Sequence, residues 1–112
     1  MNHSNRDVHV VNRDHQVFRK SLDIICGKWR LLILLNLGEH TRRYGELRRM
    51  MPDVSEKVLI QELKTLISLG VLEKESFNEV PPRVEYRLTT KGLKVLPLLY
   101  DLKHIGEPFM EL

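Results

Sequence analysis

The chain has 112 residues, of which 42% are hydrophobic and 29% are charged, and its formal net charge is +3. These values are ordinary for one soluble globular domain and exclude a chain that is disordered throughout. The longest apolar run, Leu31 to Leu35, is too short to span a bilayer. The single cysteine, Cys26, excludes an intramolecular disulfide and fits a reducing compartment, so we expect a cytoplasmic protein with no membrane partner.

Positive charge is concentrated in one part of the sequence. Residues 27–49 include six basic residues and two acidic ones, an excess of four positive charges. A local excess of this kind attracts a polyanion such as nucleic acid, while the rest of the surface stays near neutral. A solvated helix face has the same composition, so charge alone leaves both interpretations open.

The first elements predicted along the chain are a tail and two helices. Residues 1–15 show no helical or strand period and are predicted to form a flexible N-terminal tail. Apolar residues recur at helical spacing from Gln16 to Ile25, and Gly27 interrupts that segment. Trp29 to Leu37 is so apolar that we expect a core helix, with Trp29 as a packing anchor.

Two further helices are predicted after the basic step Arg42-Arg43. The first covers Tyr44 to Met51, and Pro52-Asp53 then forces a turn. The second, about residues 55–69, has Ser55 as its N-cap and Gly70 as its stop. Its apolar side is formed by Leu59, Leu63, Leu66 and Ile67, and its polar side by Lys57, Gln61, Lys64, Thr65 and Ser68.

A hairpin and a last helix complete a single predicted domain over residues 16–112. Alternating residues predict two strands within about 71–88, joined by a loop that contains Pro81-Pro82. Thr89 is placed as the cap of the last helix, about residues 90–110, and Pro97 should kink it. The apolar stripe of this helix is formed by Leu93, Leu96, Leu99, Leu102, Ile105 and Phe109.

This order of elements predicts an α+β, mostly α fold, a winged helix-turn-helix. In such folds the second helix of the pair enters the major groove of duplex DNA. We expect Lys57 and Gln61 to face base edges, Lys64 to reach the DNA backbone and Ser55 to meet a phosphate at the helix N-terminus.

Arginines on both sides of this recognition helix are predicted to contact DNA. Arg42 and Arg43 would bind backbone phosphates, and the proline loop would hold Arg83 out towards a phosphate or a narrow minor groove. The prolines can equally be an ordinary hairpin stiffener, in which case Arg83 pairs with Glu79 or Glu85.

Four stretches of the chain resemble the motifs of HxlR-type winged-helix regulators, and the similarity covers about residues 16–106. The hairpin stretch is the most specific of the four. They are Leu22-Asp23-Ile24-Ile25-Cys26-Gly27-Lys28-Trp29, Arg43-Tyr44-Gly45-Glu46-Leu47, Ser55-Glu56-Lys57-Val58-Leu59 and Glu79-Val80-Pro81-Pro82-Arg83-Val84-Glu85-Tyr86 with Leu88-Thr89.

The resemblance implies a homodimeric, MarR-like repressor or activator that binds a double-stranded DNA operator. It places Ser55, Lys57, Gln61 and Arg83 at the DNA and Arg43 on its backbone. Additional N- and C-terminal helices would build the dimer interface, and a partner would then cover apolar surface that one small core does not need. The dimerisation residues expected on this basis are Val17, Phe18, Leu96, Leu99, Leu102, Ile105 and Phe109.

The chain departs from the family pattern at its cysteine. Some members carry a Cys-Pro pair, used as a redox or electrophile sensor, where this chain has Gln16 and Val17, so that sensor is not carried over. Cys26 stands where many relatives have a glycine and is expected to be buried and structural. A thiol switch at Cys26 is the alternative hypothesis.

Two other classes of function were weighed. The five histidines have no metal-ligand spacing, and the chain has no phosphate-binding glycine loop, so we expect no catalytic site, no metal and no cofactor. A winged helix used for protein contact should expose more aromatic residues than this polar face offers. The sequence identifies neither the operator nor a small-molecule effector.

Overall fold

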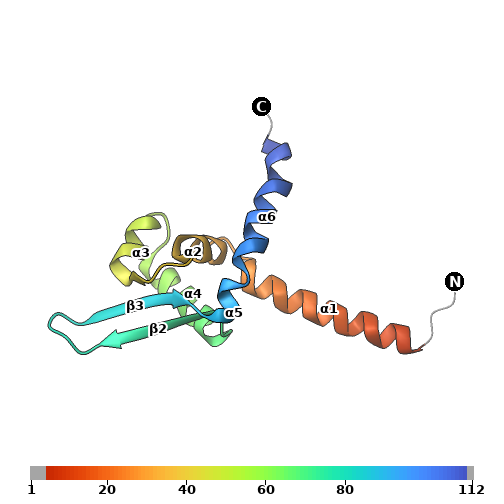
Figure 1. Cartoon of the computed structure of the whole chain (residues 1–112), viewed down its shortest axis with the longest axis horizontal. Helices are drawn as coiled ribbons and strands as arrows, with labels where there is room; N and C mark the ends of the chain where they lie inside the picture. The colour runs from red at the N-terminus through yellow and green to blue at the C-terminus, as the bar shows by residue number, and fades with distance from the viewer. Residues whose placement is uncertain (1–4, 111–112) are drawn as a thin grey trace.

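A computed structural model describes residues 5–110 and shows a mostly helical domain with one small antiparallel sheet (Figure 1). The α+β, mostly α prediction is confirmed. The elements in chain order are α1 (Asn5–Ile25), α2 (Arg30–Leu37), β1 (Arg42–Arg43), α3 (Tyr44–Met50), α4 (Glu56–Ser68), β2 (Leu72–Phe77), β3 (Arg83–Leu88), α5 (Thr90–Leu93), α6 (Leu96–Gly106) and the 3₁₀ turn η1 (Glu107–Met110).

The N-terminal segment differs from the prediction, because α1 begins at Asn5. The expected tail over residues 1–15 is therefore wrong from residue 5 onward, and residues 1–4 lie outside the described residues. A helix satisfies its backbone hydrogen bonds internally and needs no apolar stripe to continue. Residues 12–23 of α1 are all exposed, so this stretch of the helix packs little against the rest of its own chain.

Gly27 separates α1 from α2, as predicted. Its φ of +124° lies in a region that residues with a side chain rarely adopt. The two helices therefore meet at a sharp change of direction, and α1 extends away from the rest of the domain (Figure 1).

The core lies where the helices meet the sheet. The apolar side predicted for the recognition helix is confirmed, because the leucines of α4 are buried and its polar side is not. Burial of each such side chain stabilises the fold by about 1.5–3 kcal/mol. The buried residues from the principal elements are Ile33, Leu34, Leu37, Leu47, Leu59, Leu63, Leu66, Leu72, Leu88, Leu96 and Leu99.

The sheet has three strands in the order β1-β3-β2, so it includes one strand that was not predicted. Arg42 and Arg43 form β1 and pair with Tyr86 and Glu85 of β3. A two-residue strand is too short to show alternation in the sequence, and only the neighbouring strand reveals it.

The C-terminal segment is broken rather than kinked, so the single predicted helix is wrong. Thr89 caps the short helix α5, and α6 starts at Leu96 with Pro97 in its first turn. Proline has no backbone N–H to donate and suits the start of a helix, where no intrahelical acceptor is required.

Candidate nucleic-acid interface

The polar face of α4 is exposed along its length. Lys57, Gln61 and Lys64 lie at helical spacing on the side away from the buried leucines. Ser55 caps the helix, as predicted, because its Oγ accepts a hydrogen bond from the backbone N–H of Val58 at 3.2 Å. The helix therefore presents one amide and two ammonium groups from a capped, rigid segment.

Helix α3 and a short turn hold α4 in place. Met51 and Val54 in that turn are both buried in the core. Nη1 of Arg48 donates to the Met51 carbonyl oxygen at 3.0 Å and so covers the C-terminal end of α3. This pair of helices joined by a packed turn has the arrangement of a helix-turn-helix.

The two arginines of β1 differ in their surroundings. Arg42 is half-buried, and its Nε donates to the backbone carbonyl of Asn36 near the end of α2. Arg43 is exposed, and only its backbone N–H is engaged, by the Glu46 carboxylate at 2.8 Å. Of the two predicted phosphate contacts, the structure leaves Arg43 open to solvent and gives Arg42 a partner within the chain.

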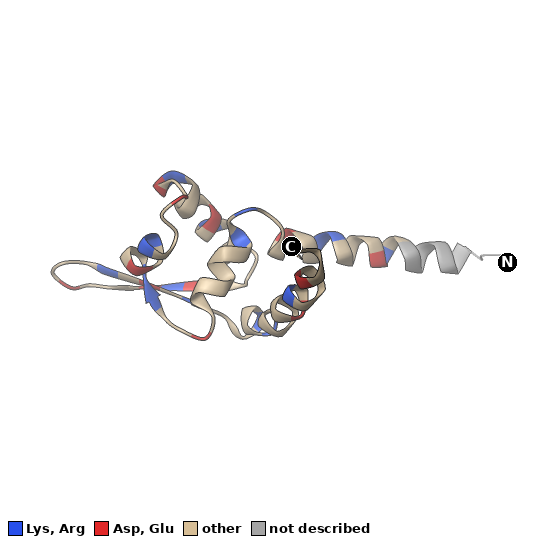
Figure 2. Cartoon of the chain, turned by 90° about the horizontal axis from the view of Figure 1, so that it is seen from above, with Lys and Arg blue, Asp and Glu red and all other residues tan. Residues whose placement is uncertain are grey.

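Internal contacts hold three arginines of the basic segment 27–49, and one of these contacts, an ion pair, offsets positive charge. Arg30 forms an ion pair with Glu62, and Arg42 and Arg48 each bond to a backbone carbonyl. Basic and acidic residues are also interspersed over the helices and over the wing, which is the hairpin of β2 and β3 (Figure 2). The fully exposed basic residues of this segment are Lys28, Arg43 and Arg49.

The tip of the hairpin does not hold Arg83 out, so that prediction is wrong. The Arg83 guanidinium lies 3.3 Å from Glu79 and 3.4 Å from Glu85, and it stacks 4.0 Å from the ring centroid of Phe77. The alternative left open by the sequence, pairing with Glu79 or Glu85, is the arrangement observed. Two carboxylates therefore offset the positive charge expected at the wing.

Two clefts meet at Tyr44, the first residue of α3, and the sequence did not predict them. One, of about 490 Å³, lies between the start of α3 and the wing tip and includes Arg43, Arg49 and Arg83. The other, of about 320 Å³, is lined by Tyr44, Glu56, Ile60, Leu63, Lys64, Ile67, Lys74, Val84 and Tyr86.

Tyr44 lines both clefts, and its hydroxyl is buried without a hydrogen-bond partner. Burial and then the negative charge of Glu56 raise the pKa of Tyr44 above its ordinary value of 10.0. Burial likewise raises the pKa of Tyr86. Tyr44 is thus a half-buried residue at the junction of α3, α4 and the sheet, with Glu56 close to its hydroxyl.

Apolar side chains are exposed on α1 and on the C-terminal helices. Val17, Phe18 (67% exposed), Leu102, Ile105 and Phe109 (85% exposed) contact solvent in the single chain, as expected of dimerisation residues. Their helices point away from the domain in different directions (Figure 1).

Two of the predicted dimerisation residues are misplaced. Leu96 and Leu99 are buried in the core of their own chain and are not free to contact a partner. On α6 the exposed apolar residues are Leu98, Tyr100, Leu102 and Ile105, because only one side of the first turns meets the core and the later turns extend beyond it (Figure 1).

Cys26 is exposed, so the expectation of a buried structural cysteine is wrong. The residue follows the last turn of α1, and its backbone N–H donates to the Leu22 carbonyl at 2.6 Å. It lies beside Gly27, where the chain leaves α1.

Two kinds of feature are absent from the described part of the chain, a metal-ligand cluster and a membrane-spanning helix. Among residues 5–110, no three His, Cys, Asp or Glu side chains come together as a set of metal ligands. No helix in this part is both long and apolar enough to cross a membrane.

Comparison with known proteins agrees with this geometry. Residues 24–112 match the HxlR-like helix-turn-helix family. The HTH-type transcriptional regulator YkvN of Bacillus subtilis (strain 168) is 36% identical over 84% of this chain and 80% of its own, and YdeP of the same organism is 35% identical over 81% and 71%.

Solved structures show the same fold. A protein described as a transcriptional regulator of the MarR family, from Porphyromonas gingivalis W83, has 49% identity and a TM-score of 0.75 over 80% of this chain and 88% of its own. The redox regulator HypR in its reduced form has 31% identity and a TM-score of 0.78 over 84% and 93%. The chain therefore belongs to the HxlR-like helix-turn-helix family, as a transcription regulator with a helix-turn-helix DNA-binding domain.

Proposed function

We propose that the chain binds a sequence-specific operator in duplex DNA as a homodimer, with α4 of each protomer in the major groove. The observation that carries the proposal is the exposed row Lys57, Gln61 and Lys64 on a capped helix whose opposite face is buried. Because the leucine side anchors α4 in the core, this polar row faces outward with little freedom to rotate.

The chemistry of the row suits base recognition. A glutamine amide pairs with two groups on adenine, and a lysine ammonium donates to the acceptors of guanine. Each good contact of this kind is worth about 1–3 kcal/mol of discrimination between bases. Lys64, one turn further along the helix, is assigned to the backbone, and the capped N-terminus at Ser55 to a phosphate.

Phosphate contacts on the flank are assigned first to Arg43, whose guanidinium is exposed. Arg42 and Arg83 have to give up their partners within the chain before they can bind phosphates. We therefore assign them a smaller part of the DNA-binding free energy than Arg43. The wing itself is assigned to the flanking minor groove or backbone.

The homodimer is supported by the exposed apolar side chains of α1, α6 and η1. Phe18, Ile105 and Phe109 are each more than half exposed, and large exposed apolar side chains of this kind mark sites of contact with another protein. A second copy offers the same surface, and a two-fold contact between copies buries both.

The first test is a titration of the purified protein against the DNA upstream of its own gene, with a scrambled competitor and a series of salt concentrations. We expect preferential binding, with log K falling by about 0.9 per phosphate contact for each unit of log salt. A footprint should show two half-sites about one helical turn apart, ~34–36 Å. Absence of any DNA binding at low salt would overturn the proposal.

The oligomeric state is tested separately by light scattering. Phe18→Glu should shift the protein from dimer to monomer, because it places a charge in the apolar contact. Val80→Glu at the fully exposed wing tip is the matched control and should remain dimeric. A wild-type protein that is monomeric at micromolar concentration would contradict the dimer.

A further inference from the structure

We infer that Arg30 is a positioning residue for DNA binding, because through Glu62 and the Asp23 carbonyl it sets the angle between α1 and α4. That angle would in turn set the spacing of the two half-sites that the protein recognises. The inference rests on the proposed function, in which α1 contributes to the dimer and α4 enters the groove.

One guanidinium connects three helices. Arg30 is the first residue of α2, its Nε donates to Oε2 of Glu62 on α4, and its Nη1 donates to the backbone carbonyl of Asp23 on α1. The two side chains are only 22% and 23% exposed, so water screens the contact less than it screens an open surface pair. Hydrogen bonds with an ionised partner are about twice as strong as neutral ones and are directional.

Few other contacts fix the direction of α1. Residues 12–23 of this helix are exposed, and within residues 12–25 only Ile24 and Ile25 are half-buried. Gly27 follows with a positive φ and breaks the backbone between the two helices. The Asp23 carbonyl contacted by Arg30 is therefore one of a small number of points at which α1 is held.

Glu62 couples the direction of α1 to the position of α4, the proposed recognition helix. It follows Gln61 directly on α4 and lies towards α2, whereas Gln61 is exposed on the polar face. Because α4 is a single 13-residue helix with a buried leucine side, it shifts as one body. A change in the position of Glu62 therefore changes the position of the whole polar row. In a dimer built on α1, the angle at Arg30 decides the distance between the two α4 helices.

The distance between the two α4 helices of a dimer matters because the helical repeat of DNA fixes where the two half-sites lie. Half-sites on one side of the double helix recur about every 34–36 Å, so two reading helices fit only when their separation matches. Loss of the Arg30 contact should leave each α4 able to bind its own half-site while weakening the preference for one spacing.

The experiment compares spacing preference with single-site affinity. Wild type and the variants Glu62→Gln, Arg30→Gln and the double variant are titrated against a duplex selected by the wild type from a random library. The same duplex is also prepared with one base pair added between the half-sites, with one removed, and with a single half-site. The matched control is Glu39→Gln, which removes an exposed carboxylate between α2 and β1, outside α1, α4 and the hairpin.

We expect the wild type to prefer the native spacing by about tenfold, within the range of coupling between two sites. Both single variants should reduce that preference to about twofold, and the double variant should match Arg30→Gln alone, because the pair acts as one unit. Single-half-site affinity should stay within about twofold of the wild type in every variant, and Glu39→Gln should behave as the wild type does.

Two results would overturn the inference alone: an unchanged spacing preference in Arg30→Gln, or an equal loss for single and paired half-sites. Thermal unfolding of each variant shows whether a loss reflects an unfolded protein, in which case Glu62→Gln, the milder change, decides. A wild type that binds one half-site as well as two overturns the dimeric function and this inference together.

Discussion

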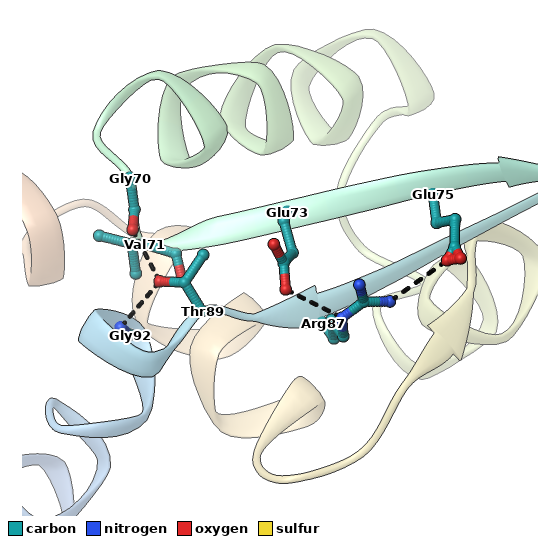
Figure 3. A network of polar contacts seen from close by, with 7 residues as sticks. All are labelled: Gly70, Val71, Glu73, Glu75, Arg87, Thr89 and Gly92. Atoms are coloured by element: carbon teal, nitrogen blue, oxygen red, sulfur yellow. Dashed lines mark hydrogen bonds and ion pairs between the residues drawn. The ribbon is translucent and has the colours of Figure 1, made fainter.

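A Cβ atom added to Gly92 in α5 would lie 2.1 Å from the carbonyl oxygen of Val71, the residue before β2. The backbone N–H of Gly92 donates to Thr89 Oγ1 at 3.1 Å, and the Thr89 hydroxyl lies 2.7 Å from the Gly70 carbonyl oxygen (Figure 3). These contacts join the end of α4 and the start of the wing to the start of the C-terminal helices.

Gly92→Ala should therefore destabilise the protein, because the backbone at Val71 has to move to admit a methyl group. Overpacking of this kind costs about 1–3 kcal/mol, which urea unfolding followed by circular dichroism will measure. Gly106→Ala is the matched control, since nothing lies within 4 Å of its added Cβ and alanine favours helix α6. Equal stability of the two variants would contradict the close approach.

Lys57→Ala should weaken binding to the operator without changing the oligomer. Loss of one base contact corresponds to about 1–3 kcal/mol, or roughly a tenfold to hundredfold rise in Kd. Fluorescence anisotropy with a labelled duplex measures the affinity, and Lys94→Ala, an exposed lysine outside the proposed interface, supplies the control. Equal affinities of the two variants would count against the placement of α4 in the groove.

Arg43→Ala and Arg83→Ala should differ in their effect on salt dependence. The Arg43 guanidinium is exposed and forms no ion pair in the described part of the chain. Its loss should therefore reduce the slope of log K against log salt by about 0.9. Arg83 is paired with Glu79 and Glu85, and its loss should reduce the slope by less than half of that amount. A larger reduction for Arg83→Ala would show that DNA displaces both carboxylates.

Tyr44→Phe should leave the free energy of unfolding unchanged or raise it, because it removes a buried hydroxyl that has no partner. Since the folded-state pKa of Tyr44 is raised above 10.0, the unfolded chain releases this proton first, and stability falls as pH rises above that value. Urea unfolding at pH 8 and pH 10.5 should show a smaller loss for the variant than for the wild type. An identical loss would show that Tyr44 ionises normally.

Cys26 should react promptly with a thiol reagent in the native protein, because its side chain is exposed. Mass spectrometry after brief labelling, with the urea-unfolded protein as the reference for full accessibility, measures the extent of reaction. A native thiol that never reacts would show that Cys26 is covered in solution and would end the thiol-switch hypothesis. Retention of DNA binding after labelling would leave the thiol reactive but uncoupled from function.

Local signals in the sequence predicted most of the helix-turn-helix. Ser55 and Gly70 mark the two ends of α4, since a side-chain cap and a residue at positive φ are local requirements of a helix. The leucines of α4 repeat with the period of one buried face, so the polar row could be placed before any neighbour was known. The strands β2 and β3 followed from alternation in the same way.

Features that depend on a partner from elsewhere in the chain could not be predicted. Arg42, Arg83 and Arg30 each look like free positive charges in the sequence, yet each is held by a group that only folding brings close. The strand β1 exists because β3 lies beside it.

The sequence by itself determined the family, the helix-turn-helix with its following hairpin, and the outward row Lys57, Gln61 and Lys64, because caps, turns and periodicity are encoded within a few residues of each other. Only the tertiary structure decided which charges remain free and which apolar residues stay exposed. Leu99 is buried and Leu102 is exposed on the same helix, since burial depends on where α6 meets the core. Electrostatic pairing and burial are properties of neighbours in space, and a linear pattern does not contain them.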